Sequence, residues 1–262
     1  MRQQATSTKR VFANWYAIAG YLYVLHLNGA SLAWEYLRRN TDYRNDWRHC
    51  DPASTVFAER WGLAFAEDPY RDAETVRPLW QFDAEQAVRI VADGSLRSER
   101  FSVWSIPGRK ALLCEENRIV LTSFLPNRSV TMAIPSDVCD GERFAYVIES
   151  GSSARSRWRV VEHHIEALQA YASAKPYVVL PRPGRAAFLH MHALHALDGI
   201  SEGASHREIA SAAFGSERVE AHWHADSELR AQVRYWIRRG EAFMRGEYRS
   251  LLVRARDGEK RR

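Results

Sequence analysis

The sequence has little cysteine. Its three cysteines, Cys50, Cys114 and Cys139, lie far apart and form no CxxC pair. An odd number at this spacing argues against a disulfide framework and against a structural zinc site, because both need cysteines grouped in the sequence. This usage is typical of the reducing cytosol, so we expect a cytoplasmic protein.

The sequence also lacks common enzyme motifs and long hydrophobic runs. It has no GxGxxG, GxxxxGKS/T, GxSxG or HExxH, so we expect no enzymatic activity and no cofactor. The most hydrophobic stretch, residues 11–27, is interrupted by Asn14 and His26 and is too short to span a membrane. We therefore expect a buried helix there, with Asn14 as its N-cap, and no membrane partner.

What remains is an ordinary core and a slight excess of positive charge. Apolar residues make up 46% of the 262 residues, enough for one large domain or two to three small ones. Lys and Arg number 37 against 32 Asp and Glu, which gives a formal net charge of +5. This charge is compatible with nucleic-acid binding, but many other proteins have it too.

The first region, residues 1–70, has the pattern of a helical domain. We expect one helix from Asn14 to the break at Gly29 and a second at 31–39, with Ser31 as its N-cap and a left-handed Asn40 at its end. Thr41 or Asp42 is expected to cap a third helix, and residues 53–65 to form a fourth.

The second region, residues 76–150, has the pattern of a small sheet. Residues 84–93 are expected to form a helix. Five short runs rich in β-branched and aromatic residues follow, separated by turn signals such as Pro-Gly and Asp-Gly, at 101–106, 110–115, 117–124, 129–135 and 143–150. We expect these runs to form a small, mostly antiparallel sheet.

The third region, residues 151–262, returns to helices. Helices are expected at 155–173 and 185–198, and Ser205 and Glu208 have the spacing of a capping box for a short helix that Gly215 ends. A connector at 215–226 then leads to a long helix at 227–252. The predicted fold is therefore α+β, and its C-terminal helical bundle holds a helix-turn-helix-like unit.

The long C-terminal helix carries six arginines and no lysine. Arg230, Arg234 and Arg238 recur every four residues on one face, and we expect Arg239 beside them and a looser helix from Gly240 onward. Guanidinium groups match phosphate oxygens and guanine edges, so this face is suited to DNA. The alternative is a solvated face, or one paired with the nearby glutamates 228 and 241. The opposite, apolar stripe consists of Leu229, Val233, Trp236 and Ile237.

Two stretches resemble known bacterial regulators. WEYLRRNTDYRNDW at 34–47 resembles the signature of the bacterial transcriptional-regulator-like N-terminal domain. SHREIASAAFG at 205–215 and LRAQVRYWIRRGEAFMRGEYRSLL at 229–252 resemble the C-terminal domain of unknown function that accompanies it in the transcriptional activators RovC and FseA. The resemblance implies an activator of mobile-element, conjugation, or secretion and virulence genes, with a helix-turn-helix-like C-terminal unit.

The resemblance also implies partners and site residues. The partner is double-stranded promoter DNA, with RNA polymerase or an antiactivator protein as further partners. One unit offers few base contacts, so we expect a homo-oligomer on repeated or palindromic half-sites. Where the family pattern tends to read Gly-Gly-Tyr, this chain has Gly246-Glu247-Tyr248, which adds negative charge near a phosphate contact. The expected DNA-binding residues are Arg207, Arg230, Arg234, Arg238, Arg239 and Arg249.

The dense N-terminal aromatics fill a small core or form a protein interface. We expect both, with Trp34 pointing inward and Arg38 and Arg39 outward. The candidate interface residues are Trp34, Tyr36, Arg38, Arg39 and Tyr43.

The histidines of HMHALH, at 190, 192 and 195, have no carboxylate at ligand spacing, so we interpret them as packing residues and expect no metal. Two rival functions stay open. One is a protein-interaction regulator, such as an antiactivator, that never contacts DNA. The more distant one is a metal-dependent enzyme that uses these histidines.

Overall fold

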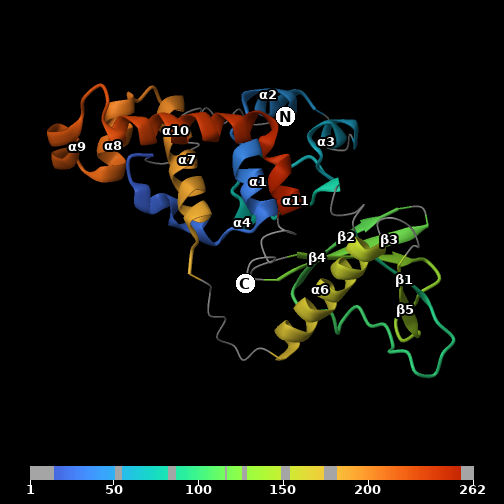
Figure 1. Ribbon diagram of the computed structural model, residues 1–262. Coiled ribbons are helices and arrows are strands. Elements are labelled where there is room, and N and C mark those ends of the chain that lie inside the picture. The colour runs from blue at the N-terminus through green and yellow to red at the C-terminus, as the bar shows by residue number, and fades with distance from the viewer. Residues whose placement is uncertain are drawn as a thin grey trace. The chain divides into compact units, whose positions relative to one another are not determined.

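A computed structural model shows an α+β protein, as expected (Figure 1). The structure describes residues 15–50, 55–81, 87–115, 117–125, 129–148, 154–173 and 182–254. Its contacts divide the chain into two compact units. The first unit holds the chain up to Trp61, Phe65–Pro78 and the chain from Pro181 onward, and the second holds Gly62–Ala64 and Leu79–Leu180.

The first unit is helical and packs helices from the N-terminal part of the sequence against helices from its C-terminal part. Helix α1 packs against η2 and α11, while α7 packs against η1 and α10 (Figure 1). The N-terminal elements are the 3-10 helix η1 (Ile18–His26), α1 (Gly29–Leu37), α2 (Thr41–His49), α3 (Thr55–Trp61) and α4 (Ala73–Val76). The C-terminal elements are α7 (Arg185–Ser201), α8 (His206–Phe214), α9 (Ser216–His222), α10 (Glu228–Ala242), the π-helical η2 (Phe243–Glu247) and α11 (Arg249–Arg254).

An asparagine starts helix α1. The side chain of Asn28 accepts a hydrogen bond from the backbone N–H of Ser31 at 2.8 Å. Asn28 is therefore the N-cap, and Gly29 is the first residue of the helix rather than a break before it. The prediction that Ser31 caps this helix was wrong, because an asparagine one turn earlier already satisfies the free N–H groups. The N-cap predicted at Asn14 lies outside the described residues.

A second asparagine starts helix α2. Asn40 has an extended backbone (φ −65°, ψ 126°), and its side chain accepts from the N–H groups of Asp42 and Tyr43 at 2.8 and 3.0 Å. The left-handed conformation predicted for Asn40 was wrong, as was the cap predicted at Thr41 or Asp42. Asn40 also donates to the carbonyl of Met244 at 2.9 Å, which ties this helix start to η2.

A buried network of charged side chains joins the N-terminal helices to α7. Arg39 donates to both carboxylate oxygens of Asp198 on α7, at 2.7 and 2.8 Å, and to Glu35 at 2.6 Å. The Tyr21 hydroxyl donates to Asp198 at 2.7 Å, and Glu35 accepts from the N–H of Ala73 at 2.9 Å. A buried charge is costly unless it is paired and hydrogen-bonded, and here each charge is both.

The pKa directions agree with this pairing. Burial by itself would lower the pKa of Arg39, but the carboxylates of Asp198 and Glu35 outweigh it and hold that pKa well above its usual range. Burial raises the pKa of Tyr21, and Asp198 raises it further. Arg39 therefore stays charged in the interior of this unit, and Tyr21 stays a hydrogen-bond donor.

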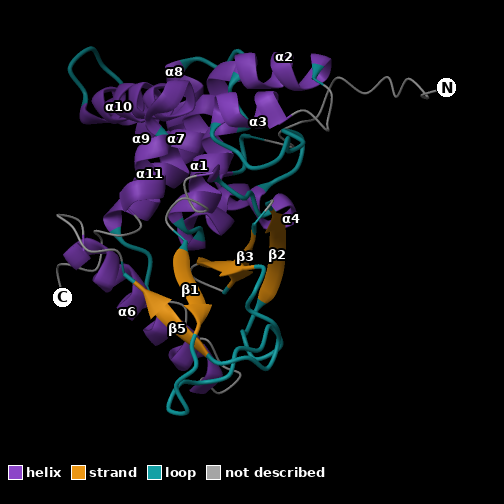
Figure 2. Cartoon of the chain, turned by 90° about the vertical axis from the view of Figure 1, so that its right-hand side faces the viewer, coloured by secondary structure: helices purple, strands orange, loops and turns teal. Residues whose placement is uncertain are grey.

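The described residues of the second unit include a five-stranded sheet and helix α6. The strand order is β2-β3-β4-β1-β5, in which β1 and β4 are parallel and all other neighbours are antiparallel, so the mostly antiparallel sheet is confirmed. Helix α6 packs against the sheet through Ala167 and Leu168, which contact Leu125 and Val130 (Figure 2). The elements are β1 (Val88–Ala92), β2 (Arg109–Cys114), β3 (Arg118–Phe124), β4 (Ser129–Pro135), β5 (Phe144–Val147) and α6 (Ala154–Ser173).

Two elements predicted in this unit were wrong. Part of the helix predicted at 84–93 is the strand β1, because Val88 and Ile90 alternate inward and are almost fully buried against the sheet's core. The strand predicted at 101–106 is a set of turns. Phe101 and Ile106 pack into the core there, while Trp104 between them is 82% exposed. No helix in the described part of the chain is long and apolar enough to cross a membrane.

Removing one partner of the buried network should destabilise the first unit strongly. Asp198→Asn keeps the shape of the side chain but leaves Arg39 without its bidentate partner, and we expect a loss of about 3–5 kcal/mol in the free energy of unfolding. Urea denaturation followed by circular dichroism measures this loss. Glu241→Gln, which breaks the exposed pair with Arg245 (3.4 Å), should cost less than about 1 kcal/mol. Equal effects of the two variants would contradict the assigned role of the network.

His195 should make stability depend on pH. Burial, helped by the neighbouring His192 and opposed by Asp198, lowers its pKa to about 4. Since the unfolded histidine titrates at about 6.5, the unfolded chain binds more protons between pH 6.5 and 4. The stabilisation is thus complete above pH 6.5 and is lost as the pH falls toward 4, by up to about 3 kcal/mol. Unfolding measured across this range should be less pH-dependent in His195→Leu, and equal slopes would contradict the assignment.

Candidate nucleic-acid interface

Helix α10 is fixed by its apolar side. Its start is capped by Ser227, whose side chain accepts from the N–H of Arg230 at 3.3 Å. The predicted apolar stripe is confirmed, because its four residues are buried in one core with residues from α7, α8 and α9. That core decides which side of α10 faces outward. Its members are Ala196, Ile209, Ala210, Val219, Leu229, Val233, Trp236 and Ile237.

Helix α8 begins and ends as predicted. Ser205 and Glu208 form a reciprocal capping box, in which each side chain accepts from the other residue's N–H, at 3.2 and 2.8 Å. Gly215, with a φ of +89°, ends the helix. The connector predicted at 215–226 instead contains α9, which is anchored in the core by Val219. A short helix therefore takes the place of a tight turn between α8 and α10.

Gly240 lets α10 cross α7 closely. A Cβ at this position would lie 2.7 Å from the Leu197 Cγ and 3.0 Å from the carbonyl oxygen of Ala193. The predicted loosening at Gly240 was wrong, because the α-helix continues to Ala242 and the non-helical residue is Gly246, with a φ of +156°.

Stacking between α7 and α10 adds to this fit. The His192 ring lies parallel to Trp236, with ring centroids 4.2 Å apart. Phe214 from α8 stacks on the same indole at 5.2 Å. The helix that carries the arginines is therefore held on its inner side by close packing rather than by surface charge.

Three arginines share the outer side of α10 as predicted. Arg234 and Arg238 are exposed and Arg230 is half-buried. Among the described residues, no acidic side chain forms an ion pair with any of the three. Positions four residues apart are displaced by about 6 Å along a helix, so the three charges form a row. Arg238 also lies over the ring of Tyr235, at 5.8 Å from its centroid.

Two other arginines of this stretch are engaged elsewhere in the unit. Arg239 donates to Glu247 at 2.9 Å and lies over the Phe243 ring at 4.6 Å, so the prediction that it sits beside the other three was wrong. Glu247, the residue that departs from the family pattern, thus neutralises an arginine of α10. Arg249 donates to the carbonyl of Arg60 at 3.2 Å. Arg207 is exposed on α8. DNA contacts by these residues stay predictions.

The sequence prediction, which relied on charge, did not name two exposed residues of α10. Gln232 and Tyr235 are both exposed on α10, and Tyr235 lies next to the row, under Arg238. Gln232 is two residues from Arg230 and from Arg234, and residues two apart do not share a helix face. The signal was present in the sequence, because both positions fall outside the apolar stripe of α10 on a 3.6-residue repeat.

The candidate interface residues of the N-terminal helices are all buried within the first unit. Trp34 donates to the carbonyl of Arg71 at 3.1 Å, and Tyr43 donates to that of Glu67 at 2.6 Å. The inward position of Trp34 is confirmed. The outward position predicted for Arg38 and Arg39 was wrong, since both are only 6% exposed. An intermolecular role for Trp34, Tyr36, Arg38, Arg39 and Tyr43 stays a prediction.

The histidines of α7 have three different surroundings. A ring nitrogen of His190 lies 2.9 Å from the Tyr36 hydroxyl, His192 stacks on Trp236, and His195 meets the edge of Tyr21. Within the residues that the structure describes, no group of three His, Cys, Asp or Glu side chains could hold a metal ion. These contacts agree with the interpretation of the histidines as packing residues.

Comparison with known protein families identifies two segments. Residues 147–253 match the family model described as "T6SS, Transcription factor, DNA binding domain", named for RovC, and residues 14–66 match the "Proteobacterial transcriptional regulator-like domain". A search among curated proteins finds no match. Both resemblances noted in the sequence are confirmed. The chain thus joins a regulator-like segment to a DNA-binding segment, which supports a DNA-binding transcriptional regulator.

The close crossing at Gly240 yields a stability test. Gly240→Ala should lower the free energy of unfolding by about 1–2 kcal/mol although alanine favours helices, because the added methyl meets backbone and Leu197. Gly20→Ala is the matched control, since its Cβ would meet nothing within 4 Å, and it should be neutral or slightly stabilising. Thermal or urea unfolding compares the two variants. A stabilised Gly240→Ala would show that α10 and α7 do not cross this closely.

Proposed function

We propose that this chain is a transcriptional activator that binds promoter DNA with the outer side of α10. The observation that carries the proposal is the row of Arg230, Arg234 and Arg238, which has no acidic partner among the described residues and stands on a helix fixed by a buried core. Exposed arginines held in a rigid row suit phosphate oxygens, whereas paired arginines would have to break an ion pair first.

In the proposed complex, α10 enters the major groove with its N-terminal half, as recognition helices of helix-turn-helix proteins do. Arg230 and Arg234 then reach base edges, and Arg238 reaches the phosphate backbone farther along. Arg207 at the start of α8 is the candidate for a second phosphate contact. The helix-turn-helix likeness is part of the proposal, because α9 lengthens the connection between α8 and α10.

We also propose a homo-oligomer, in which several such units occupy repeated or palindromic half-sites. The second unit offers the surface for this assembly, or for RNA polymerase. Trp104 is 82% exposed there, and tryptophan is enriched at protein interfaces. The division into regions 1–70, 76–150 and 151–262 stays a proposal. The name of the matched DNA-binding family favours secretion genes among the proposed targets.

The rival proposal is a regulator that acts through protein contacts alone. Tyr235 is 41% exposed under Arg238, and tyrosine and arginine are the residue types most frequent at binding hot spots. The two proposals differ in their dependence on salt. DNA binding dominated by phosphate contacts weakens with a slope of about −0.9 per contact in a plot of log affinity against log salt concentration. The rival predicts no salt-sensitive DNA binding.

Changing Arg234 and Arg238 together to alanine should abolish promoter binding while fold and oligomer persist. Both side chains are exposed and make no ion pair in the described structure, so their loss removes charge without disturbing the core. Genome-wide pull-down of bound DNA followed by footprinting supplies the promoter fragment. Gel-shift titrations at several salt concentrations then measure binding, and any residual binding should show a slope reduced by about 2.

Arg245→Ala is the matched control. Arg245 is equally exposed and basic, but it pairs with Glu241 beyond the row, so its loss should change binding little. Intact binding by the double variant, or an equal loss in Arg245→Ala, would contradict the assigned site.

A further inference from the structure

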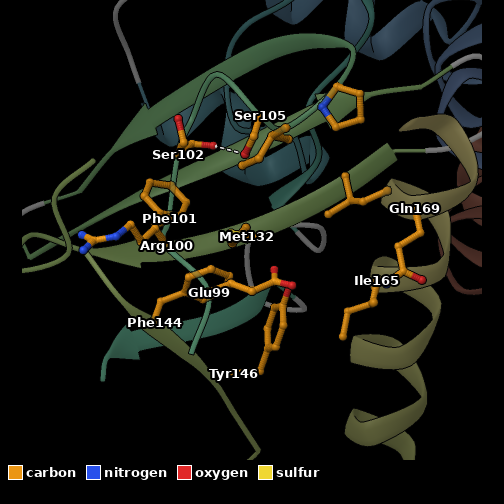
Figure 3. Close-up of a pocket in the computed structure, with 13 residues that line it drawn as sticks. Glu99, Arg100, Phe101, Ser102, Ser105, Met132, Phe144, Tyr146, Ile165 and Gln169 are labelled. Carbon is orange, nitrogen blue, oxygen red and sulfur yellow. Dashed lines mark hydrogen bonds between the residues drawn. The ribbon is translucent and has the colours of Figure 1, made fainter. Parts of the chain in front are cut away.

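A small cavity in the second unit has the lining of a ligand site (Figure 3). It lies among the sheet, the loop at 99–107 and helix α6, all of which belong to that unit. Its volume is about 270 Å³, just below the range of about 300–1,000 Å³ that ligand pockets occupy. An occupant of this cavity would therefore be small.

Eight of the thirteen lining residues are aromatic or aliphatic. Phe101 and Phe144 meet edge to face with centroids 6.0 Å apart, and Phe144 and Tyr146 do so at 5.4 Å. Met132 from β4 and Ile165 from α6 add aliphatic surface. Rings packed in this way are held in place, and their faces carry partial negative charge that attracts cations.

Two charged residues line the cavity, Glu99 and Arg100, and both are exposed. Figure 3 shows Glu99 and Tyr146 with their polar ends toward each other, and the charge of Glu99 adds to burial in raising the pKa of Tyr146. No basic side chain in the described part of the chain pairs with Glu99. Arg100 points away from the cavity and donates to the carbonyl of Gly141 at 2.7 Å. The cavity therefore offers negative charge, a hydroxyl group and aromatic faces.

We propose that this cavity binds a small organic cation, an ammonium group on an apolar body. The ammonium lies beside Glu99 and the Tyr146 hydroxyl, and the apolar body packs on Phe101, Phe144 and Met132. Glu99 and Tyr146 accept its N–H groups, and the aromatic rings add cation–π attraction. The ligand contacts the sheet and α6 at once. This site is independent of the DNA-binding row on α10, so either proposal can fail alone.

The test uses the full chain and three probes of equal size and different charge. Isothermal titration calorimetry with phenethylammonium should show saturable one-to-one binding. The neutral 2-phenylethanol and the anion phenylacetate should bind at least about tenfold more weakly, because they cannot pair with the carboxylate. Glu99→Gln should weaken phenethylammonium binding at least about tenfold, and Tyr146→Phe should weaken it less.

Two further variants test whether binding depends on this carboxylate and on this cavity. Glu115→Gln removes another carboxylate of the same unit, one that pairs with Arg118 and does not line the cavity, and it should leave binding unchanged. Ile165→Trp fills the cavity from α6 and should abolish binding, with the circular dichroism spectrum and melting temperature showing that the chain still folds. Equal binding of phenylacetate, unchanged binding by Glu99→Gln, or no heat from phenethylammonium up to millimolar concentration would each overturn the proposal.

Discussion

The first unit depends on one ion pair, between Arg39 and Asp198, which lie 159 positions apart in the sequence. Arg39 lies just after the C-cap of α1, and Asp198 lies in α7, the helix against which α10 packs. Both charges are nearly excluded from water, so each requires the other in place before the core can close. A surface pair would not impose this requirement, because water can replace either partner.

This constraint explains why the regulator-like segment and the DNA-binding segment share one core. Side chains of the WEYLRRN stretch make contacts inside the unit, as Tyr36 does when it stacks on Phe243 with ring centroids 4.9 Å apart. From the C-terminal part of the chain, the Tyr248 hydroxyl donates to the carbonyl of Trp61 at 3.0 Å. These contacts hold the helices that flank α10. The N-terminal segment therefore acts on the proposed interface by positioning it, while α10 keeps its outer side free of acidic partners among the described residues.

Local patterns in the sequence predicted much of this arrangement. The capping box of Ser205 and Glu208, the apolar stripe of α10 and four of the five predicted strands were predicted correctly, because each depends on neighbours in the chain. The position of Arg38 and Arg39 was not, since a buried arginine looks like an exposed one until its distant partner is known. Gly240 was misread for the same reason: the local sequence indicates a weak point in a helix, but contact with Leu197 makes it a close crossing. The cavity around Glu99 likewise combines residues from three elements that no spacing rule connects.

The central claim is that the outer side of α10 lies against DNA. A photoreactive amino acid placed at Tyr235, which lies under Arg238 beside the row, tests it directly, with the same group at Asp42 on the exposed side of α2 as the reference. Irradiation of the promoter complex should cross-link DNA from position 235 and not from position 42. Cross-links of equal yield from both positions, or from position 42 alone, would contradict the account.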